Sequence, residues 1–174
     1  MAGSGIVWGW RRMETLLASR YWSASWAWGL PMILAAVLFH VSGLWLFTVL
    51  ASHVECRWAN LNRSYPMFVL VLAATVLLVT IMHGLEAAAW AVAYVALGAL
   101  PDFPSAILFS LNAMTTYGHD NISLEYHWKL LGALEALNGM LLFGLTTAFL
   151  FAVAQRVWPV THGHDRPVPR HRDG

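Results

Sequence analysis

Residues 30 to 52 form a continuous run without a single charged side chain. As an α-helix at 1.5 Å per residue, such a run reaches about 35 Å, which exceeds the bilayer core of about 30 Å. Two further apolar runs, at residues 67 to 99 and 128 to 155, are also long enough to cross. The chain has 174 residues, of which 59% are hydrophobic and 11% charged, whereas a soluble domain carries about 25% charged residues. The sequence therefore predicts an all-α membrane protein that sits in a lipid bilayer.

A fourth apolar segment is too short to span the membrane. Residues 105 to 115 would reach only about 17 Å as a helix, and the polar strip TTYGHDN follows at residues 115 to 121. Non-helical backbone at membrane depth is stable only inside protein or against water, because lipid offers no hydrogen-bond partners. We therefore expect a re-entrant loop that lines an aqueous path. The alternative is a surface loop with an apolar composition.

The stretch LFSLNAMTTYGHDNISL resembles the pore helix and filter of bacterial two-helix potassium channels, in which a serine-containing apolar helix leads into T-T-x-G-Y-G-D. In a gapless alignment, five residues are those of common bacterial members: Ser110, Thr115, Thr116, Gly118 and Ile122. The next apolar run is similar to the inner helix of these channels, with Gly139 at the usual hinge glycine and Phe143-Gly144-Leu145 at a frequent F-G-L. The resemblance covers residues 67 to 156 and implies a potassium-channel-like pore module.

This resemblance divides the chain into segments. Inside the pore domain, 67 to 156, it implies an outer helix at 67–99, a pore helix at 104–115, a filter at 116–121 and an inner helix at 128–156. Before the pore domain we expect an interfacial amphipathic segment at 1–29, an extra N-terminal hydrophobic helix at 30–52 and a polar link at 53–66. Tryptophans beside arginines suit the interfacial assignment. After the pore domain we expect a mobile tail at 157–174.

By the same resemblance, the filter consists of five residues: Thr116, Tyr117, Gly118, His119 and Asp120. Three neighbours would support it: Asn112, Thr115 and Asn121. In such filters, backbone carbonyls and a threonine hydroxyl replace the water shell of the ion. His119 and Asp120 stand where the family has its tyrosine and second glycine, so the filter is degenerate and we expect weak discrimination between K⁺ and Na⁺. A ring of Asp120 carboxylates would attract cations and could hold Ca²⁺ at the mouth.

A single loop supplies one wall of a filter, so closing a path requires cyclic copies of the chain, and the resemblance implies a homotetramer. The residues matched to the cavity and gate of the family are Gly139, Met140, Phe143, Thr147 and Phe151. We expect a cation channel with no cofactor or metal, and with neither nucleic acid nor a small-molecule substrate as a partner. The alternatives are a channel fold that does not conduct and acts as a structural or regulatory subunit, and a membrane metal-site protein. Nothing at TTYGHDN resembles a nucleophile with its base, so we do not expect an enzyme.

Four polar residues lie deep inside the apolar runs: His83, Glu86, Glu135 and Asn138. His83 and Glu86 are three residues apart on one helical face, and so are Glu135 and Asn138. Ionisable groups inside membranes usually pair, so we expect structural contacts between helices, with gating or proton sensing as the alternative. Metal binding by His83 and Glu86 is the weakest alternative, because two ligands do not define a site. His40 stands isolated in its run, and we expect it to serve in packing.

The placement of charges predicts an orientation. Between residues 100 and 127 the charged residues are all acidic: Asp102, Asp120 and Glu125. Six arginines lie towards the opposite ends of the runs: Arg57, Arg63, Arg156, Arg166, Arg170 and Arg172. Positive residues prefer the cytoplasmic side, so we expect the filter outside and the C-terminus in the cytoplasm, and the resemblance implies a bacterial inner membrane. The arginines before residue 30 conflict with a single crossing by residues 30 to 52, which leaves an interfacial segment or a hairpin as alternatives there.

Overall fold

The computed structural model describes residues 4–57, 65–118 and 122–157. Within these ranges every regular element is helical. The elements are α1 (Ser4–Arg57), α2 (Tyr65–Ala96), α3 (Phe103–Thr115), the 3₁₀ turn η1 (Tyr126–Trp128) and α4 (Lys129–Val157). The prediction of an all-α fold is therefore confirmed.

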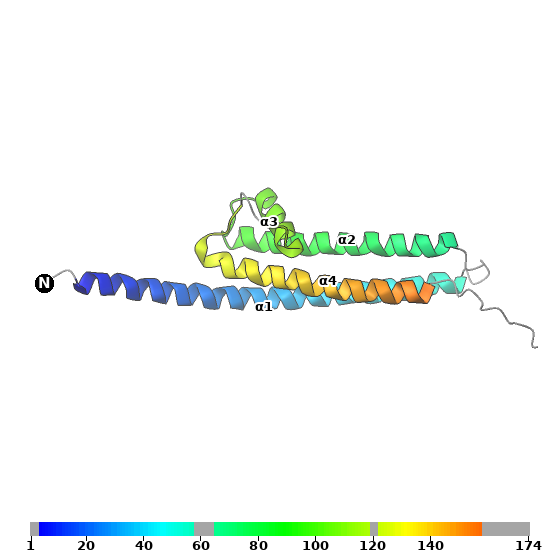
Figure 1. Ribbon diagram of the computed structural model, residues 1–174, viewed down its shortest axis with the longest axis horizontal. Helices are drawn as coiled ribbons and strands as arrows, with labels where there is room; N and C mark the ends of the chain where they lie inside the picture. Colours follow the sequence, from blue (N-terminus) through cyan, green and yellow to red (C-terminus); the bar gives the residue numbers. More distant parts are fainter. Residues whose placement is uncertain (1–3, 58–64, 119–121, 158–174) are drawn as a thin grey trace, which may run out of the picture.

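Three long helices lie side by side, and a short one leans against them. In Figure 1, α2 runs antiparallel to α1 and α4, and α3 lies across α2 near one end of the bundle. The short helix packs on both α2 and α4, whereas α1 packs mainly on α4. By length and composition, three helical stretches could cross a membrane, at Tyr21–Ser52, Val69–Ala96 and Lys129–Arg156, and α3 is apolar but shorter. The expected order of span, span, half-span and span is therefore present.

Helix α1 is continuous where the sequence suggested two segments that meet near residue 30. It passes through Pro31 without a break. A proline removes one helical hydrogen bond, but membrane helices tolerate it because neighbouring groups satisfy the freed carbonyl. At 1.5 Å per residue the helix is about 80 Å long, against about 40–45 Å for a whole bilayer. Its N-terminal part accordingly extends well past the other helices (Figure 1).

Helix α2 ends at Ala96, although the apolar run continues to residue 99. Gly98 adopts a φ of 67°, a left-handed conformation that glycine reaches without steric penalty. The N–H of Ala99 then donates to the carbonyl of Tyr94 at 2.9 Å. A glycine in this conformation just past the last turn is a common helix C-cap, so backbone geometry ends α2 before the composition changes.

The core lies where α2, α3 and α4 meet. Trp90 and Tyr94 on α2 are fully buried, and they pack with Phe109 of α3 and Leu131 of α4. The ring of Phe109 meets that of Tyr94 edge-on at 5.3 Å between centroids. Such edge-to-face pairs add about 0.5–1.5 kcal/mol beyond their buried area. This aromatic cluster fixes the position of the short helix on the bundle.

Gly139 allows the closest approach between α3 and α4. A Cβ at this position would lie 2.5 Å from the carbonyl oxygen of Met114 and 2.6 Å from its Cα. Both atoms belong to the backbone of α3, so no side-chain rotation could relieve the clash. The glycine is therefore required for the packing of α3, whatever further role it has.

Candidate functional site

The N-terminus of α3 is capped by the acidic residue that precedes it. Asp102 accepts a hydrogen bond from the backbone N–H of Ser105 at 2.9 Å and another from the hydroxyl of Ser105 at 3.0 Å. Pro104 occupies the first turn, where its missing N–H is not needed. The sequence used Asp102 only as one of the acidic residues between 100 and 127, and the structure adds a local role for it as the N-cap that starts α3.

The C-terminus of α3 leads into a non-helical strip. Thr116 has a φ of 56° and a ψ of 22°, and its N–H donates to the last carbonyls of the helix, those of Asn112 and Ala113. Gly118 also has a positive φ, of 97°. Tyr117, which lies between them, does not have a positive φ. This alternation of φ is neither helix nor strand. Two left-handed residues, Thr116 as the C-cap of α3 and Gly118 two residues later, therefore end the helix and turn the chain away from it.

Two of the predicted supporting residues make hydrogen bonds at the end of α3. Thr115 donates its hydroxyl to the carbonyl of Leu111 at 2.7 Å, and the carbonyl of Asn112 also accepts from the N–H of Tyr117 at 3.1 Å. The side chain of Tyr117 is 84% exposed. The remaining predicted residues of the filter and its support, His119, Asp120 and Asn121, lie outside the described residues.

A cavity of about 400 Å³ lies behind the strip. It opens between α3, the loop and the first turns of α4, and its lining includes Asn112, Thr116, Gly118, Lys129, Gly132 and Ala136. The strip therefore stands away from its own α4, with its far side accessible.

One buried carboxylate joins the three helices of the core. Glu135 on α4 is fully buried and accepts a hydrogen bond from the Tyr94 hydroxyl of α2 at 2.6 Å. Its other oxygen accepts from the hydroxyl of Ser110 on α3. These are the contacts between helices that the sequence predicted for Glu135. Asn138 is also buried, but among the described residues its side-chain nitrogen and oxygen have no hydrogen-bond partner.

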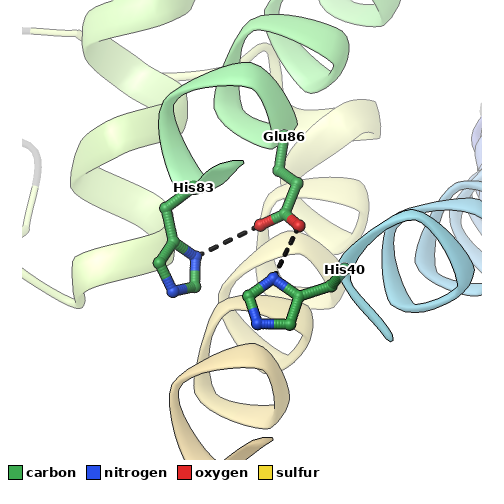
Figure 2. A group of neighbouring side chains, drawn as sticks. All are labelled: His40, His83 and Glu86. Atoms are coloured by element: carbon green, nitrogen blue, oxygen red, sulfur yellow. Dashed lines mark hydrogen bonds and ion pairs between the residues drawn. The ribbon is translucent and has the colours of Figure 1, made fainter. Parts of the chain in front are cut away.

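A second buried cluster joins α1, α2 and α4. Figure 2 shows the imidazoles of His40 and His83 turned towards the carboxylate of Glu86. His40 Nδ1 lies 2.8 Å from Glu86 Oε1, and His83 Nδ1 lies 3.2 Å from Glu86 Oε2. On their other sides, the Nε2 atoms of His40 and His83 lie 3.0 Å and 3.1 Å from the hydroxyl oxygen of Thr146.

His40 is thus not the isolated packing residue that the sequence suggested. Its side chain is fully buried and contacts two polar groups from other helices. Glu86 is 46 residues away along the chain, so no local spacing could reveal the pair. The signal available in the sequence was a histidine in mid-span, which needs a polar partner wherever that partner comes from.

The residues predicted to line a cavity fall into two groups. Met140, Phe143 and Phe151 are 61%, 49% and 65% exposed, and they share one stripe of α4 with the exposed Thr147. Gly139 is buried against α3 instead. The ring of Phe143 also stacks on His83 at 5.2 Å between centroids, so the exposed stripe touches the second polar cluster.

Comparison with known families agrees with this arrangement. A family described as ion channel matches residues 67–156, which is slightly more than half of the chain. The matched region begins within α2 and ends within α4, and therefore contains α3 and the strip that follows it. No curated protein and no solved structure matches the chain. With three apolar helices of spanning length and this match, the chain is an integral membrane protein that belongs to the two-transmembrane-helix, potassium-channel-like ion-channel family.

Proposed function

We propose that the protein is a homotetrameric cation channel of potassium-channel type, with a weakly selective filter formed by residues 116 to 120. Membership of an ion-channel family supports conduction. The observation that carries the proposal is the half-length helix α3, which ends at Thr116 in a strip with alternating φ values. Carbonyl and hydroxyl oxygens of Thr116, Tyr117 and Gly118 would replace the water shell of a permeating ion.

Electrostatics favours cations over anions as the permeant species. The C-terminal end of a helix carries a partial negative charge, and α3 has no basic residue in its last turn to oppose it. The sequence between residues 100 and 127 contains acidic residues and no lysine or arginine. An acidic entrance with these properties raises the local concentration of cations.

Four copies of the chain would complete the site. One strip forms one wall, so a closed path needs cyclic symmetry. The cavity behind Thr116 and Gly118 leaves room for an element of a neighbouring copy. The exposed stripe of α4 would then face the axis, where large apolar side chains such as Phe143 and Phe151 could gate by dewetting.

The altered outer half of the filter determines the proposed selectivity. His119 and Asp120 replace residues that complete the ion sites in potassium-selective relatives, so fewer stacked sites would remain for dehydrated K⁺ or Na⁺. A ring of Asp120 carboxylates could also hold Ca²⁺ at the mouth. By charge placement we propose that the filter faces outward and the C-terminus faces the cytoplasm, in a bacterial inner membrane.

Reconstitution into vesicles tests the proposal. We expect the purified protein to be a tetramer that carries a flux of monovalent cations, and Gly118→Ala to abolish the flux because alanine is strained at a φ of 97°. Gly84→Ala is the matched control, since a Cβ there meets nothing within 4 Å. Tetramers that carry no flux would favour the non-conducting alternative. A stable monomer with the strip facing lipid would exclude the channel.

A further inference from the structure

The buried cluster of His40, His83, Glu86 and Thr146 contains more polar contacts than it has N–H and O–H hydrogens to donate. Four contacts close the ring between the two imidazoles, the carboxylate and the hydroxyl. With neutral imidazoles and an ionised carboxylate, the ring holds three hydrogens, one on each imidazole and one on the hydroxyl. At least one contact must therefore join two acceptor atoms, and a cation between them would remove the conflict.

The contact between His83 and Glu86 has the geometry of such a conflict. His83 Nδ1 and Glu86 Oε2 lie 3.2 Å apart, and the Glu86 side chain is 1% exposed. Both atoms are buried, and neither has a hydrogen-bond partner in the part of the chain that the structure describes. A buried polar atom without a hydrogen-bond partner lacks solvation. A cation bound by both atoms would therefore stabilise them.

The ligand atoms are close to the spacing of a tetrahedral metal site. One ligand atom from each of His40, His83 and Glu86 can be chosen so that all lie within 4.8 Å of one another. Nitrogen and oxygen ligands at about 2.0–2.1 Å from a tetrahedral zinc ion are about 3.3 Å apart. The observed separations, 2.8 Å from His40 Nδ1 to Glu86 Oε1 and 3.2 Å from His83 Nδ1 to Glu86 Oε2, lie within about 0.5 Å of this value, although they involve the two different oxygens of the carboxylate.

Thr146 completes the arrangement from outside. Metal-bound imidazoles usually donate their second N–H to an outer acceptor, which fixes the tautomer and the ring orientation. The hydroxyl oxygen of Thr146 has two lone pairs, and it lies within hydrogen-bond distance of Nε2 of both His40 and His83. If both Nε2 atoms carry hydrogen and donate to Thr146, both Nδ1 atoms lack hydrogen and are free to act as ligands; Figure 2 shows these nitrogens on the side of the carboxylate of Glu86.

We propose that His40, His83 and Glu86 bind a divalent transition-metal ion, with zinc as the ion that suits two imidazoles and a carboxylate. One additional proton would supply the fourth hydrogen and satisfy all four contacts, whereas a metal ion would instead use the lone pairs of all three ligands. The site would bind α1, which lies entirely outside the family match, to α2 and α4. This proposal goes beyond conduction and does not depend on it.

Metal analysis of the full-length protein in detergent tests the site. His162, His164 and His171 in the tail are first replaced by glutamine, so that they cannot bind metal adventitiously. We expect about one zinc ion per chain to remain after washing with a weak chelator, and cobalt(II) to give the visible absorption of a tetrahedral site. Thr146→Val should weaken metal affinity by about 10-fold to 100-fold, as loss of an outer-shell partner does.

Matched variants distinguish binding from folding. His83→Gln and Glu86→Gln should remove the stoichiometric metal. Glu135→Gln and His127→Gln are the controls, and each makes the same chemical change outside the cluster. His83→Cys keeps a ligand at the same position, so its cobalt form should gain a sulfur-to-cobalt charge-transfer band.

Three results would overturn the proposal. The first is a parent protein that retains far less than one metal ion per chain, which would leave a proton as the cation in the cluster. The second is full metal occupancy in folded His83→Gln and Glu86→Gln proteins. The third is a folded His83→Cys protein that binds cobalt without a thiolate band.

Discussion

Replacing Gly139 by alanine separates two roles for this residue, a flexible hinge and a packing position. The new Cβ would lie 2.5 Å from the carbonyl oxygen of Met114 and 2.9 Å from its carbonyl carbon, so α3 itself would have to move. Overpacking of this kind typically costs about 1–3 kcal/mol, and a clash with backbone belongs near the upper end. Alanine recovers about 1 kcal/mol of helix propensity over glycine. We therefore expect a net destabilisation of about 2 kcal/mol.

Gly144→Ala provides the reference for this measurement. It makes the same chemical change one turn further along α4, where a Cβ meets nothing within 4 Å. The gain in helix propensity is shared by both variants, so their difference in unfolding free energy should equal the clash alone, about 3 kcal/mol. Denaturant titration in detergent, followed by circular dichroism, measures the difference. Equal stability of the two variants would refute the packing argument, and an altered flux with unchanged stability would identify a hinge.

Three further expectations concern the core and the filter. Ser110→Ala removes one of the two donors to the buried carboxylate of Glu135 and should lower the unfolding free energy by about 1–3 kcal/mol. The same denaturant titration measures this change, and Ser123→Ala at an exposed serine is the control. An unperturbed histidine side chain has a pKa of about 6.5. As the external pH falls through this range, positive charge at position 119 should repel cations, so flux should fall, and His119→Gln should flatten this pH dependence. The double change His119→Tyr with Asp120→Gly should increase selection of K⁺ over Na⁺ and weaken block by external Ca²⁺, as measured by reversal potentials in mixed solutions.

Each of these expectations has a result that contradicts it. A Ser110→Ala protein as stable as the parent would show that the hydroxyl is not needed by Glu135. An unchanged pH profile in His119→Gln would remove this histidine from the conduction path. Strong K⁺ selectivity in the unmodified protein would show that residues 119 and 120 do not weaken the filter.

Features that depend on nearby residues could be predicted from the sequence. The apolar runs predicted the three helices of spanning length and the shorter one. The short helix α3 runs from Phe103 to Thr115, with Pro104 in its first turn, and the expected range was 104 to 115. The cap by Asp102 follows the ordinary preference for aspartate before a helix. The spacing of His83 and Glu86 also placed both on one face of α2, where the structure has them.

Features that depend on distant residues could not be predicted. The partners of Glu86 and Glu135 come from other helices, and no period along one helix identifies them. The continuity of α1 was missed because the composition changes near residue 30, from tryptophans beside arginines to an uncharged run, and a change of composition does not by itself end a helix. Gly139 matched a family hinge by position, but its contact with Met114 appears only once α3 is placed.

The buried cluster that joins α1 to α2 and α4 also determines whether the pore domain can fold without α1. Residues 67–156 match the channel family without any of α1, which suggests a unit that could be excised and expressed alone. Glu86 and His83 lie inside that unit, whereas His40, the other partner of Glu86, lies outside it. A truncated protein would lose the hydrogen bond between His40 and this buried carboxylate, and carboxylates without enough partners are expensive in any membrane. The N-terminal helix and the pore domain are thus mutually dependent, and a deletion that respects the family boundary would cut through the folding unit.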